Sequence, residues 1–208
     1  MRYLLVSTTL LISAVSQANL LTNGSFEEGP APSGFVPDSQ GGMQLNTGST
    51  AIPGWTVTGD QIAWLHTTNF WGITASDQTK SLDLSGYTDS GSAGGIEQTF
   101  ATVPSQQYLV QFDIGAQQPS WGPTDIIVSA ASQSATFQAI PTGSQQWTTK
   151  SWIFTANSAF TTLNFSENNP SRTAYNGLDN AIVTAVPEPA SILGLVLGGA
   201  YFIRRRRN

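Results

Sequence analysis

The chain has 208 residues, no cysteine, one histidine and a formal net charge of −5 at pH 7. The absence of cysteine excludes disulfide bonds, thiol catalysis and Cys-ligated zinc. Residues 19–187 contain 12 carboxylates and three cations, so this part carries a net charge of −9, which argues against binding to nucleic acid or to anionic lipid.

The first 18 residues have the features of a secretory signal peptide. Met1-Arg2 is a short positive start, residues 4–15 are apolar, and small residues stand at Ser16 and Ala18, before an expected cleavage point. The mature chain is therefore expected to begin at Asn19 and to be exported.

Residues 19–185 are predicted to form one all-β domain. They are rich in Gly, Ser, Thr and Asn and have no 3.6-residue apolar repeat of useful length. Between residues 107 and 114 every second side chain is apolar, which places one face of a strand in a core. Turn-separated segments of this kind favour an antiparallel sandwich of two sheets. The strands are predicted within residues 19–28, 52–58, 61–65, 81–84, 95–100, 107–114, 126–130, 135–139, 147–155, 161–166 and 178–186, with a Pro/Gly-rich loop through Gly42.

Residues 186–208 form a tail of different character. Proline bars helix entry through Val186, Pro187, Glu188 and Pro189, so this stretch is expected to be extended and open to a processing enzyme. The apolar run Ala190–Ile203 follows, and as a helix it spans roughly 21 Å, less than the ~30 Å hydrocarbon core of a bilayer. Four arginines behind it hold that end in the cytoplasm. The tail is thus predicted to be an apolar helix that inserts only transiently.

This order of motif, apolar run and basic cluster resembles the PEP-CTERM sorting signal of exported bacterial proteins. The resemblance implies that an exosortase, a membrane protease, cuts near residues 186–189. The protein is then expected at the cell envelope, at the outer surface or in the extracellular matrix. The alternative, a buried C-terminal core helix, is disfavoured by the arginines.

Seven motifs along the body carry a second resemblance. In their order they look like the choice-of-anchor C proteins, which are related to DUF642 domains and, more loosely, to galactose-binding-like carbohydrate-binding modules. The resemblance implies a jelly-roll β-sandwich without established catalysis and, in some relatives, polysaccharide binding. The chain departs from the pattern at Asp77-Gln78, where the family has Asp-Gly. The motifs are Asn23-Gly-Ser-Phe-Glu27, Ile52-Pro-Gly-Trp55, Ser81-Leu-Asp-Leu84, Ile96-Glu-Gln-Thr-Phe100, residues 108–113, Thr161-Thr-Leu163 and Leu178-Asp-Asn180.

The same resemblance implies a structural calcium ion between the first and last strands. Glu27 and Asp179 would supply carboxylates, and Asn23, Asp83 and the carbonyl of Lys80 are candidates for the remaining ligands. Calcium suits such a set because it takes 6–8 oxygen ligands. The alternative is that Glu27 is a surface acid and that Asp179 forms a turn.

The tryptophans suggest a sugar-binding surface, since the face of an indole stacks on a pyranose ring. Trp71, Trp121 and Tyr175 stand in loop-like sequence and are the candidates for ligand binding. The alternative is that these aromatics fold back over the edge of the sandwich. Of the other tryptophans, Trp55 and Trp152 fit core positions, and Trp64 and Trp147 fit either.

Two carboxylates at suitable separation would be needed for glycoside hydrolysis, and sequence does not measure that separation. Solvated acids on strand faces are the better interpretation of the four candidates, and His66 has no serine partner marked by the sequence. The four acids are Asp83, Glu97, Asp113 and Asp125.

The sequence therefore favours an exported, non-catalytic β-sandwich that binds polysaccharide. The alternative function is a structural or adhesive surface protein without a specific ligand, and a glycoside hydrolase is a distant third.

Overall fold

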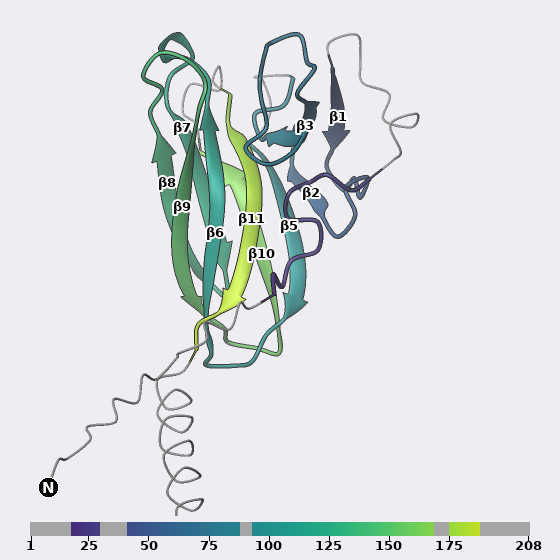
Figure 1. Cartoon of the computed structure of the whole chain (residues 1–208). Helices are drawn as coiled ribbons and strands as arrows, with labels where there is room; N and C mark the ends of the chain where they lie inside the picture. The colour runs from purple at the N-terminus through teal and green to yellow at the C-terminus, as the bar shows by residue number, and fades with distance from the viewer. Residues whose placement is uncertain (1–17, 30–40, 88–92, 169–174, 188–208) are drawn as a thin grey trace, which may run out of the picture.

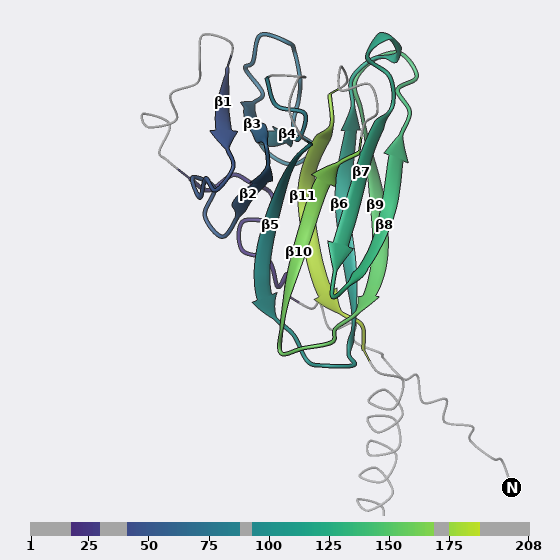
Figure 2. The same cartoon turned by 180° about the vertical axis from the view of Figure 1, so that it is seen from behind.

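A computed structural model describes residues 18–29, 41–87, 93–168 and 175–187. The described chain is all-β, with two antiparallel sheets packed face to face (Figures 1 and 2), as the sequence predicts. The predicted signal peptide, apart from its last residue Ala18, and the predicted apolar tail helix lie outside these residues. Within the described ranges no helix is long and apolar enough to span a membrane.

The first sheet has six strands and the second has five. Figure 1 shows β9, β6 and β11 of the first sheet in front, and Figure 2 shows β5, β10, β7 and β8 of the second. In spatial order the first sheet is β1 (Gly42–Asn46), β3 (Gln61–His66), β4 (Lys80–Asp83), β11 (Gly177–Ala185), β6 (Gln107–Ala116) and β9 (Gln146–Thr155). The second is β2 (Thr56–Gly59), β5 (Gly94–Ala101), β10 (Phe160–Glu167), β7 (Thr124–Ala130) and β8 (Gln133–Ala139).

The core lies between the two sheets, and the alternating residues of β6 face it. Phe112 of β6 contacts Phe165 of β10 with ring centroids 5.1 Å apart, and Trp55 lies 6.3 Å from the same ring. Trp55 and Trp64 are almost completely buried, and Trp152 is half-buried against the core. The predicted core position of Trp55 is confirmed, and Trp64 proves to be a core residue as well.

The beginning of the body differs from the prediction. Residues 19–28 are not a regular strand; they lie along β11 and bond to its edge. Asn19 Nδ2 donates to the Ala181 carbonyl at 3.1 Å, and Leu20 N donates to the Val183 carbonyl at 2.9 Å. A Cβ on Gly24 would lie 2.0 Å from the Ala181 carbonyl oxygen, so glycine is required for this approach. This segment completes the edge of β11 beyond β4.

Two further features of the fold were not predicted from the sequence: strand β1 and the path of the chain at Gly59-Asp60. β1 begins at Gly42, where the Pro/Gly-rich loop was expected to end, and it pairs with β3 although no strand was predicted there. The turn at Gly59-Asp60 is not a hairpin, because β2 pairs with β5 in one sheet while β3 pairs with β1 and β4 in the other. The chain therefore crosses from one sheet to the other at this turn.

The sandwich has two distinct ends. The start of β6 pairs with the last residues of β11, and the end of β6 pairs with Gly177, where β11 begins. We call the end with loops 102–106, 131–132 and 156–159 and residues 186–187 the tail end. The opposite end, with loops 67–79, 117–123 and 140–145 and residues 175–176, is the loop end, drawn uppermost in Figure 1.

Candidate functional site

Loop 67–79 joins β3 to β4 and is shaped by one buried amide. Asn69 Nδ2 donates to the carbonyls of His66 at 2.8 Å and Ile73 at 2.6 Å, and its Oδ1 accepts from Ile73 N at 3.0 Å. These bonds close residues 66–73 into a tight turn, as Asn side chains commonly do by bonding nearby backbone. Phe70 stands at its tip with 81% of its surface exposed.

Side chains from two other loops and from β9 fix loop 67–79 to the loop end. Gln117 Nε2 donates to the Trp71 carbonyl at 3.3 Å. Gln145 Oε1 accepts from Thr74 N at 2.7 Å while its Nε2 donates to the Thr74 carbonyl at 2.8 Å, and Trp147 Nε1 donates to the same carbonyl at 3.1 Å. The loop is therefore held in place before any ligand arrives. Sequence reasoning missed both glutamines, because nothing local marks them as loop anchors.

An aromatic cluster lies beneath the loop on the outer face of the six-stranded sheet. Trp71 is half-buried and its ring centroid is 5.6 Å from that of Tyr87. Tyr175 meets Trp147 edge to face at 6.3 Å. A Cβ on Gly115 would lie 2.9 Å from both of these rings, so the missing side chain makes the room for them.

The structure corrects the expectation for Tyr175. Its side chain is only 2% exposed, and burial raises the pKa of its phenol well above the ordinary value. Tyr175 is thus a support for the loop end and does not offer a face to a ligand. Trp121 is the last residue of a short 3-10 helix, η1 (Pro119–Trp121), at the loop end. Its side chain lies outside the described part of the structure, so its predicted role stays a prediction.

Glu27 is the first of the predicted calcium ligands. Its carboxylate accepts from Thr79 N at 2.8 Å, Thr79 Oγ1 at 2.7 Å and Lys80 N at 2.6 Å. Lys80 Nζ donates to the Glu27 carbonyl at 2.8 Å and lies 4.8 Å from the centre of the Trp64 ring. Lys80 therefore contacts Glu27 through its backbone N–H and its ammonium group, and the role predicted for its carbonyl oxygen stays a prediction.

Asp179 is completely buried and bonds to the other end of the same loop. Its carboxylate accepts from the backbone N–H groups of Ser76 at 2.8 Å, Asp77 at 2.9 Å and Asn180 at 2.7 Å. Burial raises the pKa of Asp179 to about 7, against the lowering effect of these bonds. Glu27 and Asp179 thus hold the two halves of segment 76–80.

Asp83 belongs to a different group of polar side chains. It accepts from Ser85 N and Asn176 N, both at 3.0 Å, and burial raises its pKa to about 7. Asn176 is fully buried, and its Nδ2 donates to Ser85 Oγ and Glu167 Oε1, both at 2.9 Å. Its Oδ1 accepts from Asp125 N at 3.1 Å. This network joins three strands at the loop end.

The five predicted calcium ligands are thus divided among separate hydrogen-bonded groups, with Asn23 bonded to the backbone of Glu28. No three His, Asp or Glu side chains of the described chain gather in a group that could hold a metal ion. The five residues therefore do not form a single hydrogen-bonded group in this structure. The calcium ion itself stays a prediction.

The acids considered for hydrolysis belong to both sheets. Asp113 is 5% exposed, and its carboxylate accepts from Thr149 Oγ1 at 2.6 Å, from Asn180 Nδ2 at 3.2 Å and from Ser76 Oγ. Bonds of this kind hold loop 67–79 on the sheet, so Asp113 acts structurally and is not the solvated acid expected. His66, the last residue of β3, bonds through Nδ1 to Thr68 Oγ1 at 2.9 Å.

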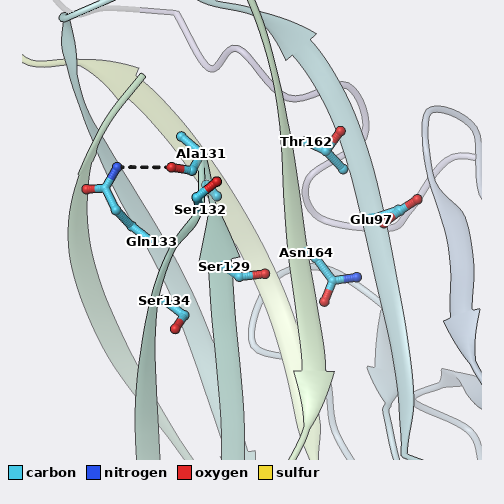
Figure 3. Close-up of a pocket in the computed structure, with 9 residues that line it drawn as sticks. Glu97, Ser129, Ala131, Ser132, Gln133, Ser134, Thr162 and Asn164 are labelled. Carbon is cyan, nitrogen blue, oxygen red and sulfur yellow. Dashed lines mark hydrogen bonds between the residues drawn. The ribbon is translucent and has the colours of Figure 1, made fainter. Parts of the chain in front are cut away.

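A second candidate surface is a hollow of about 470 Å³ on the five-stranded sheet (Figure 3). Seven of its nine lining residues are polar, and Glu97 is the only acid among them. None of these nine residues is aromatic, so the hollow offers hydroxyls and amides but no ring on which a sugar could stack. The lining residues are Glu97, Ser129, Ala130, Ala131, Ser132, Gln133, Ser134, Thr162 and Asn164. The loop end is therefore the stronger candidate.

Comparison with known proteins gives one family and one curated relative. A family described as "Protein of unknown function (DUF642)" matches residues 19–181. Halomucin of Haloquadratum walsbyi is 30% identical over 189 residues, which are 89% of this chain and 2% of that protein. The chain thus spans a very small part of its curated relative.

Among solved structures, the sandwich is similar to that of TmCBM61 in complex with β-1,4-galactotriose. The TM-score is 0.53 at 16% identity, covering 81% of this chain and 99% of that one. The arabinose-bound α-L-arabinofuranosidase MgGH51 gives the same TM-score at 13% identity, but only 26% of its chain is covered. At these identities the likeness shows a sandwich fold of the kind found in carbohydrate-binding modules.

Proposed function

The chain belongs to the family described as "Protein of unknown function (DUF642)", and we propose that this member binds carbohydrate without catalysing a reaction. The observation that carries the proposal is the tip of loop 67–79, where Phe70 is exposed and Trp71 half-exposed beside it. The fold supports the proposal, because a module of similar architecture, TmCBM61, was crystallised with β-1,4-galactotriose.

The chemistry of the tip suits a sugar. A pyranose ring presents a face of C–H groups that stacks on an aromatic ring, and its hydroxyls bond to neighbouring amides and carbonyls. Loop 67–79 is already fixed by Gln117, Gln145 and Trp147, so little conformational freedom would be lost on binding. Exposed aromatics on a prearranged loop are more useful to a binding protein than to a hydrolase, which also needs paired carboxylates.

A glycan array probed with purified residues 19–187 tests this function. Saturable binding to one class of glycan is expected, and Phe70→Ala and Trp71→Ala should each weaken it by at least about 2 kcal/mol, roughly 30-fold. Phe160→Ala is the matched control, because Phe160 is also exposed but lies at the opposite end of the sandwich. An affinity unchanged by both loop variants would move the site away from the loop end.

The alternative function gives a different result. A structural or adhesive surface protein without a specific ligand would bind no glycan even at millimolar sugar. Absence of binding across the array would therefore support that alternative and contradict carbohydrate recognition.

The proposal includes the cellular route expected from the termini. The chain would be exported by residues 1–18, held briefly in the inner membrane by the apolar run, and cut by an exosortase near residues 186–189. Intact-mass measurement of protein from the native envelope should show a chain that starts at Asn19 and lacks residues 190–208. Recovery of the complete tail from a host that has the protease would contradict the processing step.

A further inference from the structure

The loops at the tail end contain no charged residue. Residues 102–106, 131–133 and 156–160 lack Asp, Glu, Lys and Arg, and so do residues 181–187 at the end of β11. The body carries a net charge of −9 over residues 19–187, and at the loop end Asp77 of loop 67–79 adds a carboxylate to loops that are otherwise uncharged as well. An acidic protein approaching a negatively charged surface meets least repulsion through such an end.

Two large apolar side chains project from these loops. Val103 is 63% exposed and Phe160 is 66% exposed. They lie on neighbouring segments, since Thr102 N donates to the Ala159 carbonyl at 2.9 Å and Phe160 pairs with Ala101. Figure 1 shows both loops at the lower end of the sandwich, beside the end of β11.

The backbone fixes this exposure. Ser105 N donates to the Ala156 carbonyl at 2.8 Å, and Ala156 N donates to the Gln106 carbonyl at 3.0 Å. Thr102 Oγ1 donates to the Ser158 carbonyl at 2.9 Å, and Val103 N donates to the buried Tyr108 hydroxyl at 2.8 Å. Because the two loops are bonded to each other and to the core, Val103 and Phe160 cannot turn inward without breaking several hydrogen bonds.

The tail leaves the body at the same place. Val186 N donates to the Gln107 carbonyl at 2.8 Å, and Gln106 Nε2 donates to the Val186 carbonyl at 2.5 Å. The apolar run begins at Ala190, three residues after Pro187, and three residues reach at most about 11 Å. The headgroup layer is itself about 5–7 Å deep on each side of the hydrocarbon. Insertion of the run therefore brings the tail end to the headgroups.

We propose that the tail end rests on the lipid surface while the tail is inserted, with Val103 and Phe160 in the headgroup layer. The sandwich then stands upright, and β11, nine residues long, separates the loop end from the lipid by about 30 Å. The partner is the bilayer itself. The inference rests on the anchoring step proposed above and is independent of sugar binding.

The absence of cysteine allows a direct test on the full chain. Val103→Cys and Phe160→Cys are labelled with an environment-sensitive fluorophore, and the chain is inserted into vesicles of phosphatidylethanolamine and phosphatidylglycerol that contain a nitroxide headgroup lipid. Phe70→Cys, at the other end, is the matched control. The nitroxide lipid should quench the fluorophores at positions 103 and 160 at least about twice as much as the fluorophore at position 70, as expected for contact with the interface.

Each outcome decides something different. Equal, weak quenching at all three positions in vesicle-bound chains would overturn the inference while leaving anchoring intact. Chains that do not float with vesicles would overturn anchoring and the inference together. A spectral change at positions 103 and 160 that appears without vesicles and grows with protein concentration would mean that a second copy covers this end, which also contradicts the proposal.

Discussion

The loop end and the tail end of the sandwich differ in how much of their hydrogen bonding is buried. The loop end buries carboxylates and amides in networks centred on Asn176 and Asp179, and it covers part of the outer sheet face with a loop fixed by side-chain bonds. The tail end uses short loops held by backbone bonds and by side-chain bonds that are mostly exposed or part-buried, and it exposes Val103 and Phe160.

This difference between the two ends should affect the free energy of unfolding. Buried polar networks are costly when any member is lost, because the remaining partners stay desolvated. Bonds that are exposed or part-buried cost less when one partner is lost, because water can replace that partner. We therefore expect the loop end to be sensitive to substitution and pH, and the tail end to tolerate both.

The largest expected effect is that of Asn176→Ala. The variant removes two donor bonds and one acceptor bond at a fully buried position, so the free energy of unfolding should fall by about 3–5 kcal/mol in urea titrations. Thr102→Val at the tail end removes a hydroxyl that bonds to the Ser158 carbonyl and to the buried Thr161 hydroxyl, and it should cost about 1–2 kcal/mol. Equal losses would remove the contrast between the ends.

The next effect is a dependence of stability on pH. The pKa values of Asp83 and Asp179 are raised from 3.8 to about 7, so between these values the folded state binds more protons than the unfolded state. The free energy of unfolding should therefore fall as the pH rises from about 4 to about 7, by up to about 1.4 kcal/mol per pH unit for each group. Above pH 7 this contribution should be constant.

Urea titrations of Asp179→Asn across the same range check the assignment. The substitution removes one of the two titrating groups, so the slope should become shallower, whereas Thr102→Val should keep the slope of the parent chain. An unchanged slope in Asp179→Asn would show that this carboxyl is already charged at pH 4.

Truncation of the exposed phenylalanines should have little effect on stability at either end. Phe70→Ala and Phe160→Ala remove rings that are mostly in solvent, so each should change the free energy of unfolding by no more than about 0.5 kcal/mol. Thermal melts suffice for this comparison. A loss of more than about 2 kcal/mol in either variant would show that the ring is needed for folding and would undermine its proposed contact.

The smallest expected effect is that of a chelator. Glu27 and Asp179 are already bonded to backbone N–H groups, so EDTA should shift Tm by about 1 °C or less. A fall of several degrees, restored by calcium and absent in Asp179→Ala, would instead establish the ion predicted from the sequence.

The sequence pattern predicted the elements whose apolar and polar residues alternate locally. The period-two pattern from Tyr108 to Ile114 identified β6, and the apolar positions of Ile52-Pro-Gly-Trp55 identified a core tryptophan. β1 was missed because Gly42-Met-Gln-Leu-Asn46 is short and begins with glycine. The sequence Gly59-Asp60 is compatible both with a hairpin turn and with the observed crossing between the two sheets.

The candidate site is formed by contacts between segments that are distant in the chain. A local sequence pattern does not predict such contacts. Tyr175 stands in loop-like sequence, but its burial is made possible by Gly115, 60 residues away in the chain. Loop 67–79 is positioned by Gln117 and Gln145, whose role appears only once β3, β6 and β9 lie in one sheet. Phe70 therefore became a candidate only when the structure showed its exposure.

The position of β11 limits when the six-stranded sheet can be completed during folding. It is the last strand of the described chain, yet it lies between β4 and β6 in the middle of the six-stranded sheet, and the first residues of the body bond to its edge. A chain that crosses a membrane N-terminus first cannot close this sheet until residue 185 has emerged, because the central place remains empty. Only a few residues then separate β11 from the apolar run that we propose halts translocation. Completion of the fold and arrest in the membrane would thus coincide, so the protein would mature at the membrane and not during its passage.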